Sequence, residues 1–73
     1  MNNAYWVAWV EIDPITKYAK HEWEAYFTSL EETLSEAMRL LKLPYVGKVA
    51  IADIFGIIYD WSNVEGNLAW KRQ

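Results

Sequence analysis

The chain has 73 residues and a formal net charge of −3. A chain of this length can bury one core, so we expect a single domain over residues 1–73. Its hydrophobic fraction of 53% and aromatic fraction of 16% exclude the polar composition of disordered proteins. Because the chain has no cysteine, a disulfide framework and a thiolate metal site are excluded as well.

The start of the chain and its apolar runs indicate a cytoplasmic protein. Met1-Asn2-Asn3 lacks the basic start and the apolar stretch of a signal peptide. No apolar run approaches the roughly 18 residues that a membrane span requires, so we expect no membrane partner. The negative charge disfavours a partner made of phosphates and favours a protein with a basic surface.

Residues 4–27 have the pattern of two strands joined by a turn. Residues 4–12 are apolar on both alternating faces, which predicts a strand that is central in a sheet or covered by a partner chain. Asp13-Pro14 has the composition of a turn. Residues 20–27 alternate between apolar and polar side chains, as in a half-buried antiparallel strand. We therefore expect a β-hairpin.

A capping box and an apolar stripe predict one amphipathic helix. Ser29 and Glu32 have the spacing at which their side chains satisfy backbone N–H groups of the first helical turn. An apolar stripe with a period of about 3.6 follows, at Leu30, Leu34, Ala37, Met38 and Leu41. Pro44 prevents the helix from continuing beyond about Leu43. We expect this helix to pack on the sheet.

The second half of the chain predicts two or three further strands. Lys48–Phe55 is rich in β-prone residues and forms the third expected strand. Gly56 either closes a tight turn or makes a bulge in one long strand that continues to Trp61. Beyond a polar loop, Leu68-Ala69-Trp70 can pair back against residues 57–61. The expected fold class is therefore α+β: an antiparallel sheet of four or five strands with one helix packed on one face, in the order ββαββ or ββαβββ.

The residue types needed for catalysis and for cofactor or metal binding are sparse. His21 is the single histidine, and neither a cysteine nor a second histidine can complete a metal site or an activated nucleophile. Glu22 and Glu24 share a strand face, but carboxylates at this spacing are common on solvated strands. The three glycines stand singly, so there is no glycine-rich phosphate loop. We expect a protein that is not an enzyme and that binds no cofactor and no metal.

Three aromatic residues are candidates for a binding surface. Tyr5, Trp9 and Tyr26 are expected to share the sheet face opposite the helix, where they could stack on bases or anchor a protein interface. Few basic residues lie nearby, and Glu22 and Glu24 are close, which disfavours a single-stranded nucleic acid and favours a protein partner. The structural alternative is a core on both sides of the sheet.

Acidic residues of the second strand and of the helix form another candidate surface. They are Glu22, Glu24, Glu31, Glu32 and Glu36. Such a surface could imitate nucleic-acid phosphates and occupy a basic groove of a partner protein, whereas the ordinary alternative is solubility. Together with the three aromatics, these glutamates are the predicted partner-binding residues. The competing hypothesis is a homodimer closed through the aromatic face.

The order of the expected elements resembles that of a group of small inhibitor proteins. An aromatic first strand, a capped helix over Ser29–Leu43 and a terminal hairpin with Trp61 and Trp70 are similar to small phage and mobile-element proteins, including anti-CRISPR inhibitors. This resemblance is architectural and transfers no site residues. It implies a non-catalytic, stoichiometric inhibitor that occupies a surface of a host nucleoprotein complex.

Overall fold

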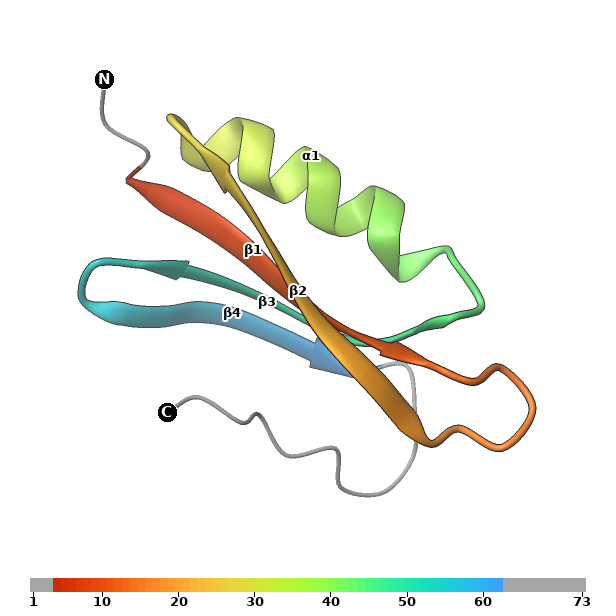
Figure 1. Ribbon diagram of the computed structural model, residues 1–73. Helices are drawn as coiled ribbons and strands as arrows, with labels where there is room; N and C mark the ends of the chain where they lie inside the picture. The colour runs from red at the N-terminus through yellow and green to blue at the C-terminus, as the bar shows by residue number, and fades with distance from the viewer. Residues whose placement is uncertain (1–3, 63–73) are drawn as a thin grey trace.

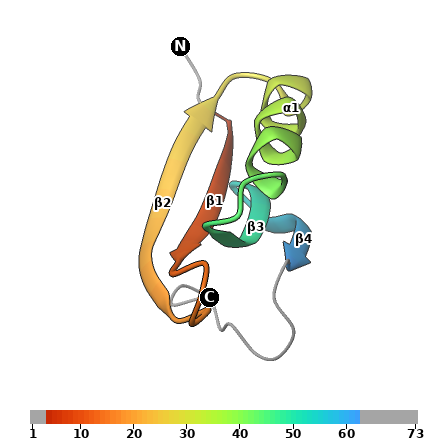
Figure 2. The same ribbon diagram turned by 90° about the vertical axis from the view of Figure 1, so that its right-hand side faces the viewer.

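The chain folds into one antiparallel sheet with a helix on one face (Figure 1). The computed structural model describes residues 4–62. The elements are β1 (Tyr5–Ile12), β2 (Ala19–Phe27), α1 (Leu30–Leu41), β3 (Val46–Asp53) and β4 (Gly56–Ser62). Among residues 4–62 the strand order is β2-β1-β3-β4, so β2 and β4 are the two edges of the described sheet (Figure 2). The predicted α+β class is confirmed, with the order ββαββ over these residues; the expected strand at residues 68–70 lies outside them.

Strand β1 lies inside the sheet, as its two apolar faces predict. It pairs antiparallel with β2 on one side and with β3 on the other, so that Val7 lies opposite both Ala25 and Ile51. The turn from β1 to β2 forms at Asp13, as predicted. The Asp13 carboxylate Oδ1 accepts the backbone N–H groups of Ile15 at 2.8 Å and Thr16 at 2.9 Å.

Helix α1 begins after the predicted N-cap residue, Ser29. The Ser29 hydroxyl oxygen accepts the backbone N–H of Glu32 at 3.2 Å, and the hydroxyl donates to the Glu32 carboxylate at 3.2 Å. The helix ends at Leu41, slightly before the expected Leu43, because the Leu43 N–H donates to the Leu40 carbonyl at 3.0 Å and so closes a tighter turn. No helix in the described part of the chain is long and apolar enough to cross a bilayer.

The buried stripe of α1 is rotated relative to the predicted stripe. Its fully buried residues are Thr33, Ala37 and Leu40, whereas Met38, which the sequence placed in the stripe, is exposed. Thr33 can be buried because its hydroxyl donates to the Ser29 carbonyl at 2.7 Å, which satisfies its polar atom. The other predicted members of the stripe do face the core: Ala37 is in the core cluster, and Leu30, Leu34 and Leu41 pack against it.

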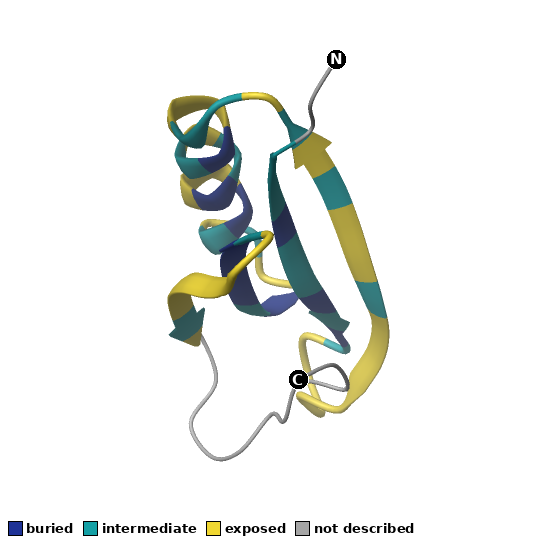
Figure 3. Ribbon diagram, turned by 90° about the vertical axis from the view of Figure 1, so that its left-hand side faces the viewer, coloured by how far each residue is buried: buried dark blue, intermediate teal, exposed yellow. Residues whose placement is uncertain are grey.

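The main buried cluster lies between α1 and the sheet face that carries Val7. Its enclosed residues are Val7, Ala37, Leu40, Val46, Val49 and Ile51. Helix α1 lies mainly over β3 and β1, and it makes little contact with β4. Figure 3 shows that buried residues gather where α1 faces these two inner strands, while β2 and β4 are largely exposed.

The structure resolves the two alternatives for Gly56. A two-residue turn at Ile54 and Phe55 joins β3 to β4, and Gly56 follows it with φ +133°, a backbone conformation that favours glycine. The Asp53 carboxylate accepts the Phe55 N–H at 2.8 Å and holds the turn. A bulge is also present, because Ala52 lies opposite Ile57 but Ile51 lies opposite Tyr59. The third strand therefore ends at Asp53 instead of the predicted Phe55.

Candidate functional site

The three predicted aromatic site residues do not share one face of the sheet. Trp9 packs against the core cluster, and Tyr5 lies opposite Phe27, which packs there as well, so both belong to the helix side. Tyr26 lies on the other face, where its ring centroid is 5.6 Å from that of Trp6. The prediction was wrong because the hairpin register places Tyr26 opposite Trp6, on the other face from Tyr5 and Trp9, and an alternating pattern does not fix that register.

The five predicted glutamates also fail to form one surface. Glu22 and Glu24 lie opposite Val10 and Ala8, on the face of the sheet away from α1. The other three, Glu31, Glu32 and Glu36, belong to α1 itself. The sheet thus separates the two acidic groups, and a single phosphate-like surface made of all five is not present.

Several of these predicted site residues already have partners within the fold. The Tyr26 hydroxyl donates to the Glu24 carboxylate at 2.7 Å. Glu32 is part of the helix cap. The Arg39 guanidinium donates to both carboxylate oxygens of Glu36, through Nε at 3.0 Å and through Nη2. This contact lowers the pKa of Glu36 and raises the pKa of Arg39. These contacts give the side chains structural roles.

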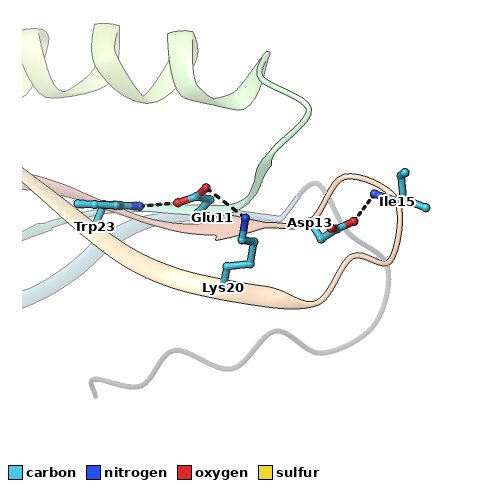
Figure 4. Close-up of polar contacts among 5 residues, drawn as sticks. All are labelled: Glu11, Asp13, Ile15, Lys20 and Trp23. Carbon is cyan, nitrogen blue, oxygen red and sulfur yellow. Dashed lines mark hydrogen bonds and ion pairs between the residues drawn. The ribbon is translucent and has the colours of Figure 1, made fainter.

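A small polar cluster lies where the β1–β2 hairpin approaches its turn (Figure 4). The Trp23 indole Nε1 donates to Glu11 Oε1 at 3.0 Å, and the Lys20 ammonium lies 4.0 Å from Glu11 Oε2. The His21 ring contacts the Trp23 ring at a tilt of 58°, with centroids 4.4 Å apart. The hydrogen bond and the ion pair therefore join Glu11 of β1 to two side chains of β2. Within residues 4–62, no three histidine or carboxylate side chains gather in a way that could hold a metal ion.

The most distinctive surface is one that the sequence did not single out. Residues 54–59, Ile-Phe-Gly-Ile-Ile-Tyr, carry no charge and form the β3–β4 turn and the first half of edge strand β4. Phe55 is 89% exposed and Ile54 is 76% exposed at the tip. We define the β4 edge surface as the exposed large side chains of this run: Ile54, Phe55, Ile57, Ile58 and Tyr59.

The two edges of the sheet differ in a way that bears on binding. An edge strand presents unpaired backbone groups, and monomeric proteins usually protect such edges with charged side chains. Edge strand β2 follows this rule, with Lys20, Glu22 and Glu24 along it. No described strand pairs with the outer side of β4, and Asp60 is the only charged residue that β4 contains. Strand β4 therefore has the composition of an interface.

Aromatic rings extend this apolar surface onto the helix side of β4. Tyr59 and Trp61 stack with ring centroids 5.6 Å apart and an interplanar angle of 14°. Tyr59 lies opposite Ile51 and Trp61 lies opposite Val49, so both rings share the face that carries the core. Because α1 lies mainly over β3 and β1, Tyr59 stays exposed there.

Sequence reasoning missed this surface because exposure depends on strand order. An apolar run such as residues 54–59 is equally typical of a buried central strand. The signal that could have identified it is the combination of an uncharged, β-prone run with its place in the second hairpin. A comparison with known protein families, curated proteins and solved structures found no match to this chain.

Proposed function

We propose that this chain is a non-catalytic protein-binding module that recognises its partner through the β4 edge surface. The observation that carries the proposal is the uncharged run at residues 54–59 on an edge strand, with all of its large side chains exposed. Burial of such side chains against a partner stabilises a complex by roughly 25 cal/mol for each Å² removed from water.

Strand pairing is the mode of recognition that this geometry favours. An extended segment that lies along β4 can form main-chain hydrogen bonds with its outer side, while Ile58 and Tyr59 contact alternate side chains of the partner. The apolar edge requires no basic groove in the partner, so it differs from the acidic interface expected from the glutamates. The phage-type inhibitor of a nucleoprotein complex is one form of such a module and stays a prediction.

Affinity capture with matched variants tests this proposal. The tagged chain is incubated with a lysate of its source cells, to which an untagged form of the same chain has been added. The variant Tyr59→Lys is compared with the variant Tyr45→Lys. The two tyrosines are 43% and 45% exposed, so the substitutions are matched in chemistry and exposure. Circular dichroism confirms that both variants fold.

We expect the wild-type chain and Tyr45→Lys to retain a defined protein in stoichiometric amount. The amount retained by Tyr59→Lys should be at least about tenfold lower, because a charge replaces an apolar anchor. Equal retention by the two folded variants would contradict the assignment of the interface to β4. Failure of the wild-type chain to retain any protein would contradict the proposed function itself.

A further inference from the structure

The tip of the β3–β4 hairpin has the geometry of an anchor. We infer that Phe55 inserts into an apolar pocket of the partner protein, and that the rim of this pocket carries lysine or arginine side chains. This inference rests on the proposed function, because it names the anchor of the same surface and the chemistry of the protein that receives it. It is carried by the exposure of the tip, by the fixed conformation of the turn and by the distribution of charge around it.

The exposure of Phe55 favours a concave partner. Phe55 is 89% exposed and Ile54 beside it is 76% exposed. The space next to the ring is open as well, because nothing lies within 4 Å of the position where Gly56 would carry a Cβ atom. An aromatic side chain that stands in solvent in this way can bury its surface from all sides only in a pocket, which is where the residues that dominate binding energy usually lie.

The turn holds Phe55 in one backbone conformation before any partner binds. The Asp53 carboxylate accepts the Phe55 N–H at 2.8 Å. Gly56, with φ +133°, lies opposite Asp53 and closes the turn in a conformation that favours glycine. Ordering a loop on binding costs free energy, so a turn that is already fixed presents its side chain at a lower cost.

The end of the molecule that carries the tip is acidic. Strand β3 ends at Asp53, which lies opposite Tyr5, and Tyr5 in turn lies opposite Phe27 at the end of β2. Helix α1 begins shortly after Phe27 and carries Glu31 and Glu32 in its first turn. Figure 1 shows the β3–β4 turn and the start of α1 at the same end of the sheet. Three carboxylates therefore lie at the end where Phe55 is exposed.

The basic side chains of residues 4–62 all lie toward the opposite end. They are Lys17 and Lys20 of the first hairpin, Arg39 and Lys42 at the end of α1, and Lys48, which lies opposite Ser62 at the far end of the second hairpin. The apolar anchor itself needs no charge in the partner. The carboxylates around it are complementary to a basic rim, which is the second feature that we assign to the pocket.

The same distribution of charge disfavours two other occupants of the tip. An anionic lipid surface attracts basic side chains and repels carboxylates. A second copy that met the first tip to tip would bring two acidic ends together. A protein pocket with a basic rim is therefore the occupant that the tip fits.

Photocrosslinking from the tip identifies the partner. The photoreactive residue p-benzoylphenylalanine replaces Phe55 in one variant. In the control it replaces Tyr18, which is 76% exposed in the β1–β2 connection at the opposite end. After illumination in a lysate of the source cells, we expect position 55 to form an adduct with one protein in a yield several-fold above that from position 18. No adduct from position 55, or equal yields from both positions, would overturn the inference.

Binding to the purified partner tests Phe55 as an anchor. Isothermal titration calorimetry compares Phe55→Ala with Tyr18→Ala, after circular dichroism has confirmed that both variants fold. We expect the Kd to be at least about tenfold higher for Phe55→Ala and to stay within about twofold of the wild-type value for Tyr18→Ala. Equal Kd values for the two variants would overturn the anchor.

A charge reversal tests the basic rim with the same purified partner. Glu31→Lys changes a residue at the tip end, whereas Glu22→Lys makes the same change opposite Val10, toward the other end of the sheet. We expect Glu31→Lys to raise the Kd at least about threefold and Glu22→Lys to raise it less than about twofold, because only the first side chain lies near the rim. Equal effects of the two reversals would overturn the basic rim.

Two measurements test the other occupants. We expect the wild-type chain not to sediment with vesicles of equimolar phosphatidylcholine and phosphatidylserine. Sedimentation that Phe55→Ala abolishes would assign the tip to a lipid surface and overturn the inference. An adduct from position 55 with a mass near twice 8.6 kDa would assign it to a second copy, with the same consequence.

The outcomes separate this inference from the proposed function. If capture of a partner depends on Tyr59 while binding is unchanged in Phe55→Ala, the anchor is wrong and the binding edge stands. If neither Tyr59 nor Phe55 affects binding, both are contradicted.

Discussion

Asp13 shows how one carboxylate can hold a turn at the residue scale. Its Oδ1 accepts the N–H groups of Ile15 and Thr16, and these donors stabilise the ionised form. The backbone hydrogen bonds therefore lower the pKa of Asp13 below its ordinary value of 3.8. A carboxylate whose pKa is lower in the folded state than in the unfolded state contributes stability above the unfolded pKa. That contribution is lost as the pH falls through the folded pKa.

Asp13→Asn should change the acid dependence of stability without removing the turn. The amide oxygen of asparagine can still accept the two N–H groups, but it carries no charge that acid could remove. We expect the urea midpoint of the wild-type chain to fall more steeply than that of Asp13→Asn as the pH is lowered below 3.8. Urea titrations at several pH values between about 5 and 2 measure this difference, and parallel curves would contradict the role of the charge.

The role of Asp13 was predictable from the sequence, whereas that of Thr33 was not. An Asp-Pro pair between two strand patterns indicates a turn whose carboxylate accepts local N–H groups. Thr33 is counted as polar in any hydropathy pattern, and its burial depends on the hydrogen bond to the Ser29 carbonyl. A prediction for a single residue therefore succeeds where a turn motif determines its role. It fails where a hydrogen bond allows a polar side chain to be buried.

At the scale of the element, the buried residues of α1 show which side of the helix packs on the sheet. Leu40 is 2% exposed and belongs to the core cluster, while Met38 is 43% exposed. The apolar pattern of the sequence is broad enough to include Met38 in the stripe. The rotation of the helix about its axis depends on the sheet against which it packs. It therefore depends on tertiary contacts, which the local sequence pattern does not contain.

Alanine substitutions at Leu40 and Met38 distinguish the observed rotation from the predicted one. We expect Leu40→Ala to lower the free energy of unfolding by about 2–5 kcal/mol, because it removes buried methyl groups and leaves a cavity. Met38→Ala should lower it by less than about 1 kcal/mol, since this side chain is partly solvated. Chemical denaturation of the two variants measures both values, and a larger loss at Met38 would support the predicted stripe.

The faces of the strands, like the rotation of the helix, were only partly predictable from the sequence. The sequence predicted that β1 is apolar on both sides and lies inside the sheet, and this was confirmed. It could not assign Tyr5 and Trp9 to the helix side, because both alternating sets of β1 are apolar. Tyr5 and Trp9 were assigned to the wrong face, whereas Tyr26, Glu22 and Glu24 lie on the face away from α1, as expected.

At the scale of the whole molecule, strand order decides which apolar residues reach solvent. The α+β class and the order ββαββ over residues 4–62 were predictable because hydrophobic periodicity and turn residues are local signals. The order β2-β1-β3-β4 was not, and it makes β4 an edge. An uncharged run that would be ordinary inside a sheet thereby becomes the β4 edge surface. The proposed function follows from this placement and not from any sequence motif.

Amide hydrogen exchange along β4 tests most directly the claim that this strand is a binding edge. Outer N–H groups of an unpaired edge exchange quickly, and pairing with a partner protects them. We expect protection of residues 57–59 to increase when the captured protein is added. Exchange along the charged edge β2 should stay unchanged. Protection that increases along β2 while β4 stays unprotected would contradict the account.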